Sequence, residues 1–174
     1  MRKLIGICVV CFVVLFGIGA YWAFNQAQRL SDPFEIMKAG VTQTSAPLSL
    51  SAVRARGDCP IELPSSATNI QFAVWSLWQA SQTFVRFDAP VSDCLEHALT
   101  VLQPYAQRAG LTIASANVSG PMPAPLVVAP KDLAIPWFDL PRFSAGVSFE
   151  VSGGRAPAVW VDTNRGCFYF EWNE

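Results

Sequence analysis

The sequence predicts an α+β protein with an N-terminal transmembrane helix followed by one two-layer domain, in which a mainly antiparallel sheet packs against one helix. Three observations lead to this prediction. An uncharged apolar run covers Leu4 to Phe24, and an amphipathic helical pattern follows Pro90. The remaining apolar runs are short and rich in β-branched and aromatic residues, as strands are. The chain of 174 residues is long enough for one anchored domain.

The composition limits the classes of function. Hydrophobic residues make up 52% of the chain and charged residues 14%, which is the balance of a folding chain and not of a disordered one. Twelve basic residues against thirteen acidic residues give a net charge of −1. Because this balance offers no basic face for phosphate backbones, DNA and RNA are not expected partners.

The run at residues 4–24 predicts a transmembrane helix. It contains no charged residue and has the length of about 20 residues that a helix needs to cross a bilayer. Arg2 and Lys3 precede it, so residues 1–3 are expected in the cytoplasm and the C-terminal domain on the other side of the membrane. Tyr21 and Trp22 suit the interface at the far end. The lipid bilayer is therefore an expected partner.

A cleavable signal peptide is the alternative to this anchor. The apolar run is longer than the hydrophobic region of most signal peptides, and bulky aromatic residues occupy the zone where small residues would allow cleavage. Cys8 and Cys11 lie within the run and are interpreted as two small apolar residues, not as a redox pair. Gly17 and Gly19 would allow close approach of another helix, which leaves a small structural subunit of a membrane complex as a further alternative.

Residues 25–57 predict a stalk, because polar residues and scattered charges mix with Pro33 and Pro47, which interrupt any long periodic run. The compact domain is then expected at residues 58–174. Its first apolar stretch, Ile70 to Trp78, fits a helix by spacing and a buried strand by composition. The aromatic and β-branched run Thr83 to Phe87 follows closely, so two paired strands are favoured.

The pattern after Pro90 predicts an amphipathic helix. Its apolar residues form a row at helical spacing, Ser92 is placed to cap the first turn, and Gly110 is placed to end it. Pro104 lies inside the pattern and is expected to end or kink the last turn. The row consists of Cys94, Ala98, Val101 and Tyr105.

The remainder predicts strands around one long loop. Leu111 to Ala114 fits a short strand, and the six prolines between 121 and 141 indicate a surface loop. Three further strands follow, the last two joined as a hairpin by a turn that contains Asn164 and Gly166. Those strands are Gly146 to Val151, Ala158 to Asp162 and Cys167 to Trp172.

Several short motifs carry a resemblance. They are Leu63-Pro-Ser-Ser-Ala-Thr-Asn-Ile70, Val85-Arg-Phe-Asp-Ala-Pro90 with Asp93-Cys94, Trp160-Val-Asp162, and Arg165-Gly-Cys-Phe-Tyr169. This pattern is similar to that of uncharacterised, single-pass bacterial envelope proteins and covers about two thirds of the exported domain. The resemblance implies a common fold, and it brings no activity, cofactor or catalytic residue with it.

The domain's three cysteines lie in the part expected to face an oxidising compartment, where disulfides persist. One pair and one remaining thiol is the simplest arrangement. A bridge between Cys59 and Cys94 is favoured, because it would fasten a turn to the start of the helix. Cys167 lies in an aromatic strand, where it would pack as a small apolar side chain.

Two constellations could carry catalysis. Cys94 at a helix start with His97 one turn away could form a nucleophile and base, which a bridge to Cys59 would exclude. Asp88 with Asp93 or Glu96 could form an acid and base pair. Caps and solvated charges explain these residues as well. No phosphate loop, dinucleotide motif or calcium loop is present, and the Cys and His spacing argues against zinc, so no cofactor is expected.

The aromatic pair Trp137 and Phe138 lies in the proline-rich loop, where it is either tucked against the sheet or offered to a partner. We take this pair as the first contact surface to test. The expected function is therefore a non-enzymatic, membrane-anchored envelope domain that binds another protein or a wall component. The alternatives are an envelope enzyme using Cys94 and His97 or a carboxylate pair, and the structural subunit described above.

Overall fold

The computed structural model describes residues 40–77, 80–122, 135–152 and 157–173. The predicted cytoplasmic tail, transmembrane helix and first part of the stalk lie outside these residues. Within the described ranges, no helix is both long enough and apolar enough to cross a membrane. The compact unit that contains the described residues extends from Gly40 to Glu174.

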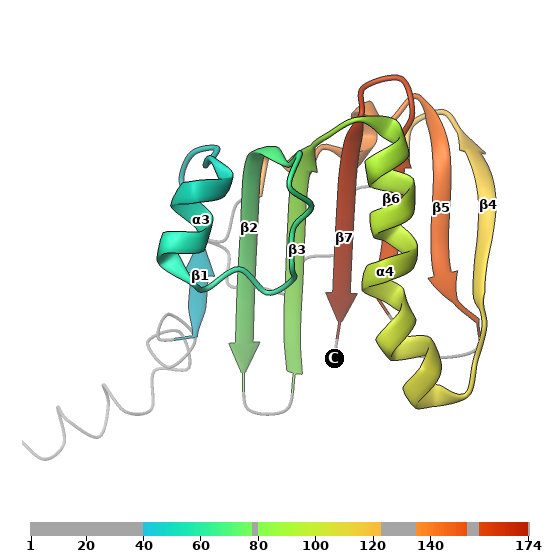
Figure 1. Cartoon of the computed structure of the whole chain (residues 1–174), viewed down its shortest axis with the longest axis horizontal. Coiled ribbons are helices and arrows are strands. Elements are labelled where there is room, and N and C mark those ends of the chain that lie inside the picture. The colour runs from blue at the N-terminus through green and yellow to red at the C-terminus, as the bar shows by residue number, and fades with distance from the viewer. Residues whose placement is uncertain (1–39, 78–79, 123–134, 153–156, 174) are drawn as a thin grey trace, which may run out of the picture. The chain divides into compact units, whose positions relative to one another are not determined.

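The core of this unit is a single antiparallel sheet of seven strands in the order β1-β2-β3-β7-β6-β5-β4 (Figure 1). Two consecutive strand pairs, β2 with β3 and β6 with β7, are hairpins, and β3 pairs with β7 at the centre. The strands are β1 (Val41–Gln43), β2 (Thr68–Leu77), β3 (Ala80–Asp88), β4 (Ile113–Ser119), β5 (Ala145–Val151), β6 (Ala158–Asp162) and β7 (Cys167–Asn173).

Two helices cover one face of the sheet, which we call the helix face. The long helix α4 (Val91–Ala109) lies over the β5, β6 and β7 side, and the short helix α3 (Leu50–Arg56) lies beside β2 (Figure 1). A 3-10 turn, η1 (Leu140–Arg142), belongs to a segment that covers the other face, which we call the loop face.

The predicted fold class is confirmed for the described residues, because they form an antiparallel sheet on one main helix. The stretch from Ile70 is a strand as far as Leu77, and it pairs with β3 as expected. The helix boundaries differ in detail. Pro104 lies inside α4, which continues to Ala109, and Ser92 bonds to Asp93 instead of capping the first turn.

The predicted stalk is corrected at its C-terminal end. Residues 40–57 contain β1 and α3, and Val53 of α3 is 3% exposed within the main core. Ser49 caps α3 by accepting from the Ala52 amide at 3.3 Å, and Gly57 ends it with a φ of 70°. The charges in this region lie on the exposed side of a short amphipathic helix. Because the segment has few apolar residues, its composition suggested a stalk and not a helix that packs on the core.

Strand alternation divides the side chains between the two faces. On the helix face, Phe87, Phe168 and Phe170 pack against Ala98 and Leu102 of α4. On the loop face, aromatic residues of β3 and β7 pack beneath the segment 135–143. The buried residues of that second cluster are Phe84, Phe138, Leu140, Phe143, Cys167 and Tyr169.

Candidate functional site

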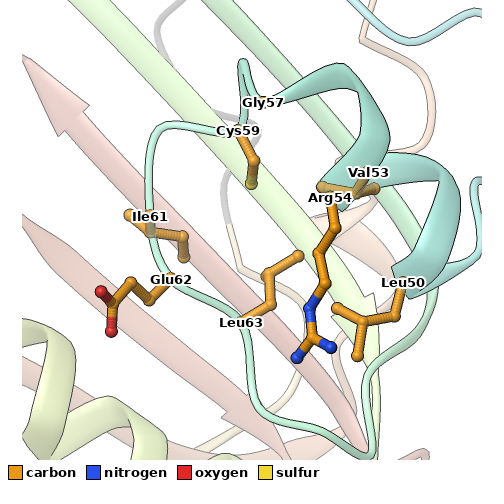
Figure 2. A pocket seen from close by; sticks show the side chains of 8 residues that line it. All are labelled: Leu50, Val53, Arg54, Gly57, Cys59, Ile61, Glu62 and Leu63. Carbon is orange, nitrogen blue, oxygen red and sulfur yellow. The ribbon is translucent and has the colours of Figure 1, made fainter.

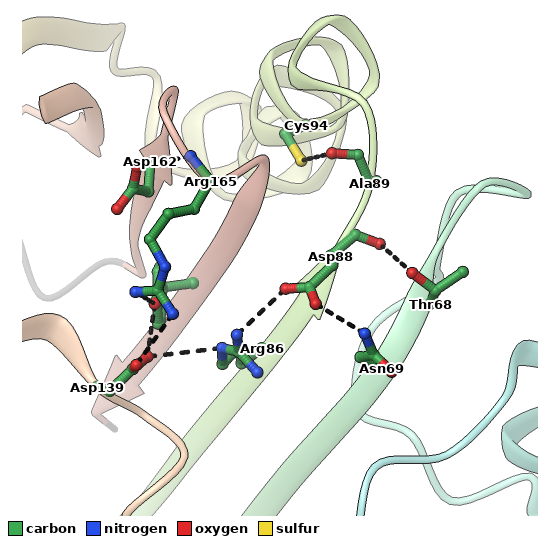
Figure 3. A network of polar contacts seen from close by, with 10 residues as sticks. Thr68, Asn69, Arg86, Asp88, Ala89, Cys94, Asp139, Asp162 and Arg165 are labelled. Atoms are coloured by element: carbon green, nitrogen blue, oxygen red, sulfur yellow. Dashed lines mark hydrogen bonds and ion pairs between the residues drawn. The ribbon is translucent and has the colours of Figure 1, made fainter. Parts of the chain in front are cut away.

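A network of charged and polar side chains lies on the loop face near one end of the sheet (Figure 3). We call it the loop-face network; it consists of Arg86, Asp88, Asp139, Arg165 and Tyr169. The register pairs Arg86 of β3 with Tyr169 of β7, so both side chains lie in one row across the sheet. Asp88 follows two residues later on the same face. Strand alternation therefore places Arg86, Asp88 and Tyr169 on this face, while Asp139 and Arg165 reach them from a loop and a turn.

Asp139 is the centre of the network. Its Oδ1 accepts a hydrogen bond from the Tyr169 hydroxyl at 2.6 Å, and its Oδ2 accepts one from Arg165 at 3.1 Å. The Nε of Arg86 lies 3.6 Å from Oδ1. Burial raises the pKa of Asp139, but the bonds from Tyr169 and Arg165 and the two positive charges outweigh it and hold this pKa below its ordinary value.

Arg86 links this centre to the neighbouring hairpin. Its guanidinium donates to Oδ1 of Asp88 at 3.2 Å, and Oδ2 of Asp88 accepts from the amide of Asn69 at 2.9 Å. Burial lowers the pKa of Arg86, but its interactions with groups such as Asp88 and Tyr169 raise it above the ordinary value. Each charge in the network therefore has a partner, and the network fastens the loop segment to the sheet.

Arg165 forms its ion pair with Asp139 and not with Asp162, which lies three residues before it in the chain. Asp162 is fully buried and shapes the hairpin turn: its Oδ1 accepts from the amides of Asn164 and Arg165, both at 3.0 Å. Its Oδ2 has no hydrogen-bond partner among the described residues. This carboxylate therefore has a structural role in the turn.

The proposed contact pair Trp137 and Phe138 is corrected in part. Phe138 is 3% exposed and packs edge-on against Phe84 and Tyr169, with ring centroids 5.2 and 5.5 Å apart. Trp137 is half-buried and packs against the cluster around Trp75. The pair is tucked against the sheet because the bonds of Asp139, the next residue, hold this segment on the loop face.

The predicted bridge between Cys59 and Cys94 is not formed, and the three cysteines that the described ranges contain are free thiols. The Sγ of Cys94 donates to the carbonyl of Ala89 at 3.6 Å. Burial raises the pKa of the Cys94 thiol to about 11 and that of Cys167 to about 12. A nucleophilic cysteine needs the opposite shift, so the structure offers no activated thiolate at Cys94.

His97, the predicted base, packs within the aromatic core. Its ring lies 5.6 Å from that of Phe87 and 5.2 Å from that of Phe168. Burial lowers the pKa of His97, while the backbone and charge of Glu62 act in the opposite direction. His97 is 9% exposed, and its Nε2 has no hydrogen-bond partner among the described residues.

The predicted carboxylate pair is divided between separate contacts. Asp88 belongs to the loop-face network, whereas Asp93 accepts from the hydroxyls of Ser66 at 2.6 Å and Ser92 at 3.0 Å. These two bonds lower the pKa of Asp93. Glu96 is exposed on α4. Among the described residues, no group of three or more His, Cys, Asp and Glu side chains is arranged to hold a metal ion.

Two hollows of the helix face are lined by the segment Pro60–Glu62 and the residues next to it. The first, which we call the α3 pocket, has a volume of about 350 Å³. Figure 2 shows that α3 and the chain that follows it enclose this hollow, with Arg54 and Glu62 among its lining residues. The Cys59 thiol also lines it, and burial raises the pKa of that thiol.

The second hollow, which we call the α4 groove, has a volume of about 290 Å³. One helical stripe of α4 forms a wall, the segment Pro60–Glu62 forms the other, and Trp172 at the end of β7 closes one part of it. Tyr105 and Trp172 meet edge-to-face with ring centroids 5.1 Å apart. The α4 residues of this stripe are His97, Thr100, Val101, Pro104, Tyr105 and Arg108.

The α4 groove was missed in the sequence because its residues fit another explanation. Val101 and Tyr105 belong to the apolar row that predicts the buried face of α4, and the segment facing them was expected to be the start of the domain. The signal that remained was His97, a polar residue at helical spacing beside that row.

Comparisons of this chain with family models, with curated proteins and with solved structures gave no match.

Proposed function

We propose that the chain is a single-pass, membrane-anchored envelope protein whose sheet domain is non-enzymatic and binds another protein through the α4 groove. The uncharged run at residues 4–24, preceded by Arg2 and Lys3, supports the anchor and the export of the domain. The engagement of Cys94 and the carboxylates in structural contacts supports a binding role over a catalytic one.

The observation that supports the binding role most directly is the buried ring nitrogen of His97 beside the α4 groove. This Nε2 atom has no hydrogen-bond partner within the part of the chain that the structure describes, and the His97 side chain lines the α4 groove. A buried polar atom without a hydrogen bond costs free energy, which a donor or acceptor on a bound ligand would recover. The aromatic edge of Tyr105 and the ring of Trp172 add the kind of surface on which interface anchor residues pack.

The size and charge of the groove favour a polypeptide as its occupant. Its volume of about 290 Å³ is at the lower limit for small-molecule sites, which span about 300–1,000 Å³, and suits one large side chain of a partner. Glu62 lines one wall and Arg108 the other. Such a pair matches a segment that has an apolar anchor residue flanked by charges of both signs.

Site-specific photo-crosslinking tests this proposal in the full chain in its native membrane. A benzophenone amino acid at Thr100, which lines the groove, should capture one protein, and the linked peptide is then identified by mass spectrometry. The same probe at Gln103, exposed on α4 but outside the groove lining, is the matched control. Equal capture at both positions, or none at Thr100, would contradict the proposal.

Binding by the identified peptide gives the second measurement. A synthetic copy should bind the purified full chain and change the fluorescence of the tryptophans, one of which lines the groove. Thr100→Arg should weaken this binding about tenfold, equivalent to about 1.4 kcal/mol, because the new charge blocks the groove. Gln103→Arg adds the same charge outside it and should leave binding unchanged. Equal affinities of the two variants would show that the peptide binds elsewhere.

A topology measurement tests the anchor separately. Cysteine-directed reagents that cannot cross the membrane should label an added cysteine at exposed Ser119 from outside intact cells. The protein should remain in the membrane after extraction at alkaline pH, because a transmembrane helix resists removal. Release into the soluble fraction with a shortened N-terminus would indicate a cleaved signal peptide instead.

A further inference from the structure

Among the described residues, β4 is the longer of the two edge strands of the sheet. β4 is an edge strand, and within the described ranges no other strand pairs with its outer side. Its sequence, Ile-Ala-Ser-Ala-Asn-Val-Ser, has no charge and no proline, and its five central residues include four exposed ones. Natural edge strands usually carry a charge, a proline or a bulge that prevents pairing with another chain. β4 carries none of these.

The hydrogen-bond pattern identifies which backbone groups face outward. The carbonyl of Thr112 accepts from Ser152 at 3.0 Å, and the amide of Gly120 donates to Ser144 at 2.8 Å. Along an antiparallel strand, the residues whose backbone N–H and C=O groups bond to a given neighbour alternate with residues whose groups point to the other side. The even-numbered residues of β4 therefore direct their backbone groups toward β5. The outward N–H and C=O groups therefore belong to the four odd-numbered residues Ile113, Ser115, Asn117 and Ser119.

We propose that the edge of β4 binds a second copy of this chain, with the two β4 strands antiparallel about a two-fold axis at Ala116. In this register Ser115 pairs with Asn117 of the other copy, and Ile113 pairs with Ser119. All four outward-facing residues then meet one another and form about eight backbone hydrogen bonds. The two sheets become one continuous sheet, with the same patch on both copies, as a two-fold interface requires.

The side chains of β4 favour this occupant. The residues that would meet across the axis are small or polar: Ala116 meets Ala116, and Ala114 meets Val118. No like charges are brought together, and the hydroxyl of Ser115 can bond to the amide of Asn117. The other sheet edge, β1, has only three residues, so it offers far fewer outward groups. An interface of one strand pair is small, so we expect a weak dimer.

Disulfide trapping tests the proposed register in the full chain in membranes. At the axis, the two copies of residue 116 form a non-hydrogen-bonded pair with Cα atoms about 4.5 Å apart, which lies within the range for a disulfide. Ala116→Cys should therefore give a covalent dimer under mild oxidation. Ala114→Cys is the matched control, because residue 114 is also exposed and would face residue 118 instead. We expect about tenfold less dimer from it.

Two further variants complete the test. A mixture of Ala114→Cys and Val118→Cys chains should give the heterodimeric link that neither variant forms alone. Adding Ser115→Pro to Ala116→Cys should abolish the link, because it removes an outward amide and leaves the bonds to β5 in place; circular dichroism checks that this variant stays folded. Equal trapping at 114 and 116, or dimers at the level of the wild-type chain, would overturn the proposal.

Discussion

The two faces of the sheet share the same strands but are covered in different ways. On β7, Phe168 points to the helix face and packs with Phe87 beneath α4, whereas the next residue, Tyr169, points to the loop face and bonds to Asp139. A periodic helix covers the first face with apolar side chains. An irregular segment covers the second, and polar bonds hold it there. Apolar contacts therefore bury both faces, and on the loop face polar bonds are added to them.

Removing an aromatic residue from the helix face should have the largest effect. Phe168 is fully buried, and its ring lies stacked on Phe87 with a centroid distance of 4.5 Å. Phe168→Ala should lower the free energy of unfolding by about 3–5 kcal/mol, because it removes buried apolar surface and leaves a cavity. Urea denaturation of the purified protein measures this change. A loss below about 1 kcal/mol would show that the helix face can collapse around the cavity.

Removing the centre of the loop-face network should have a smaller effect. Asp139→Ala should lower the free energy of unfolding by about 2–3 kcal/mol, because the Tyr169 hydroxyl loses its acceptor. This is somewhat less than the loss of one partner of a fully buried ion pair, because Arg86 keeps Asp88 as a partner. The control is Arg165→Ala: its side chain is 34% exposed, so its loss should cost less than about 1 kcal/mol. Equal losses would show that the network is not centred on Asp139.

The sequence predicts the helix face much better than the loop face. The row of Cys94, Ala98 and Val101 has helical spacing, and paired β-rich runs lie on both sides of it in the chain, so the sheet and its main helix follow from periodicity. No comparable period exists between Met122 and Leu140. The position of that segment depends on a carboxylate that reaches Arg86, and those two residues are far apart in the sequence.

The candidate sites were harder to predict for a related reason. Sequence spacing placed Cys94 and His97 near one another, but it could not indicate that burial would disfavour their charged forms. Phe138 was open to two interpretations until its contacts with Phe84 and Tyr169 were known. The groove depends on how residues 60–62 cross the sheet, and no local pattern in the chain specifies that path.

The dependence of stability on pH should distinguish the two faces. Burial holds the pKa of His97 below its ordinary value of about 6.5, so the unfolded chain binds a proton more readily. The stabilisation from neutral His97 is therefore complete above about pH 6.5 and is lost as the pH falls through the folded pKa. The pKa of Asp139 is also lowered, so its contribution is lost below about pH 4.

Variants separate the pH range in which His97 contributes from the range in which Asp139 contributes. His97→Phe should flatten the decline in urea midpoint below pH 6.5, and Asp139→Asn should flatten the decline below pH 4. Glu171 acts in the opposite sense, because burial raises its pKa and its protonation therefore stabilises the folded chain as the pH falls toward 4.5. Glu171→Gln is the control for that contribution. If His97→Phe leaves the decline below pH 6.5 unchanged, His97 is not its source.

The smallest effect is expected when Asn69 loses only its side-chain amide; at this residue β2 has an irregular register and joins the edge of the loop-face network. Asn69 has a φ of 49°, a conformation that Asn adopts more readily than most residues, and its amide donates to Asp88 at 2.9 Å. Asn69→Gly keeps the backbone conformation and loses only an exposed bond, so it should change stability by less than about 0.5 kcal/mol. Asn69→Val loses the bond and also strains the backbone, so it should cost about 1–3 kcal/mol in urea denaturation. Equal costs for the two variants would place the contribution of Asn69 in its hydrogen bond. The unequal costs expected here place it in the backbone, where the short polar side chain allows the irregular register of β2 between Thr68 and Gln71.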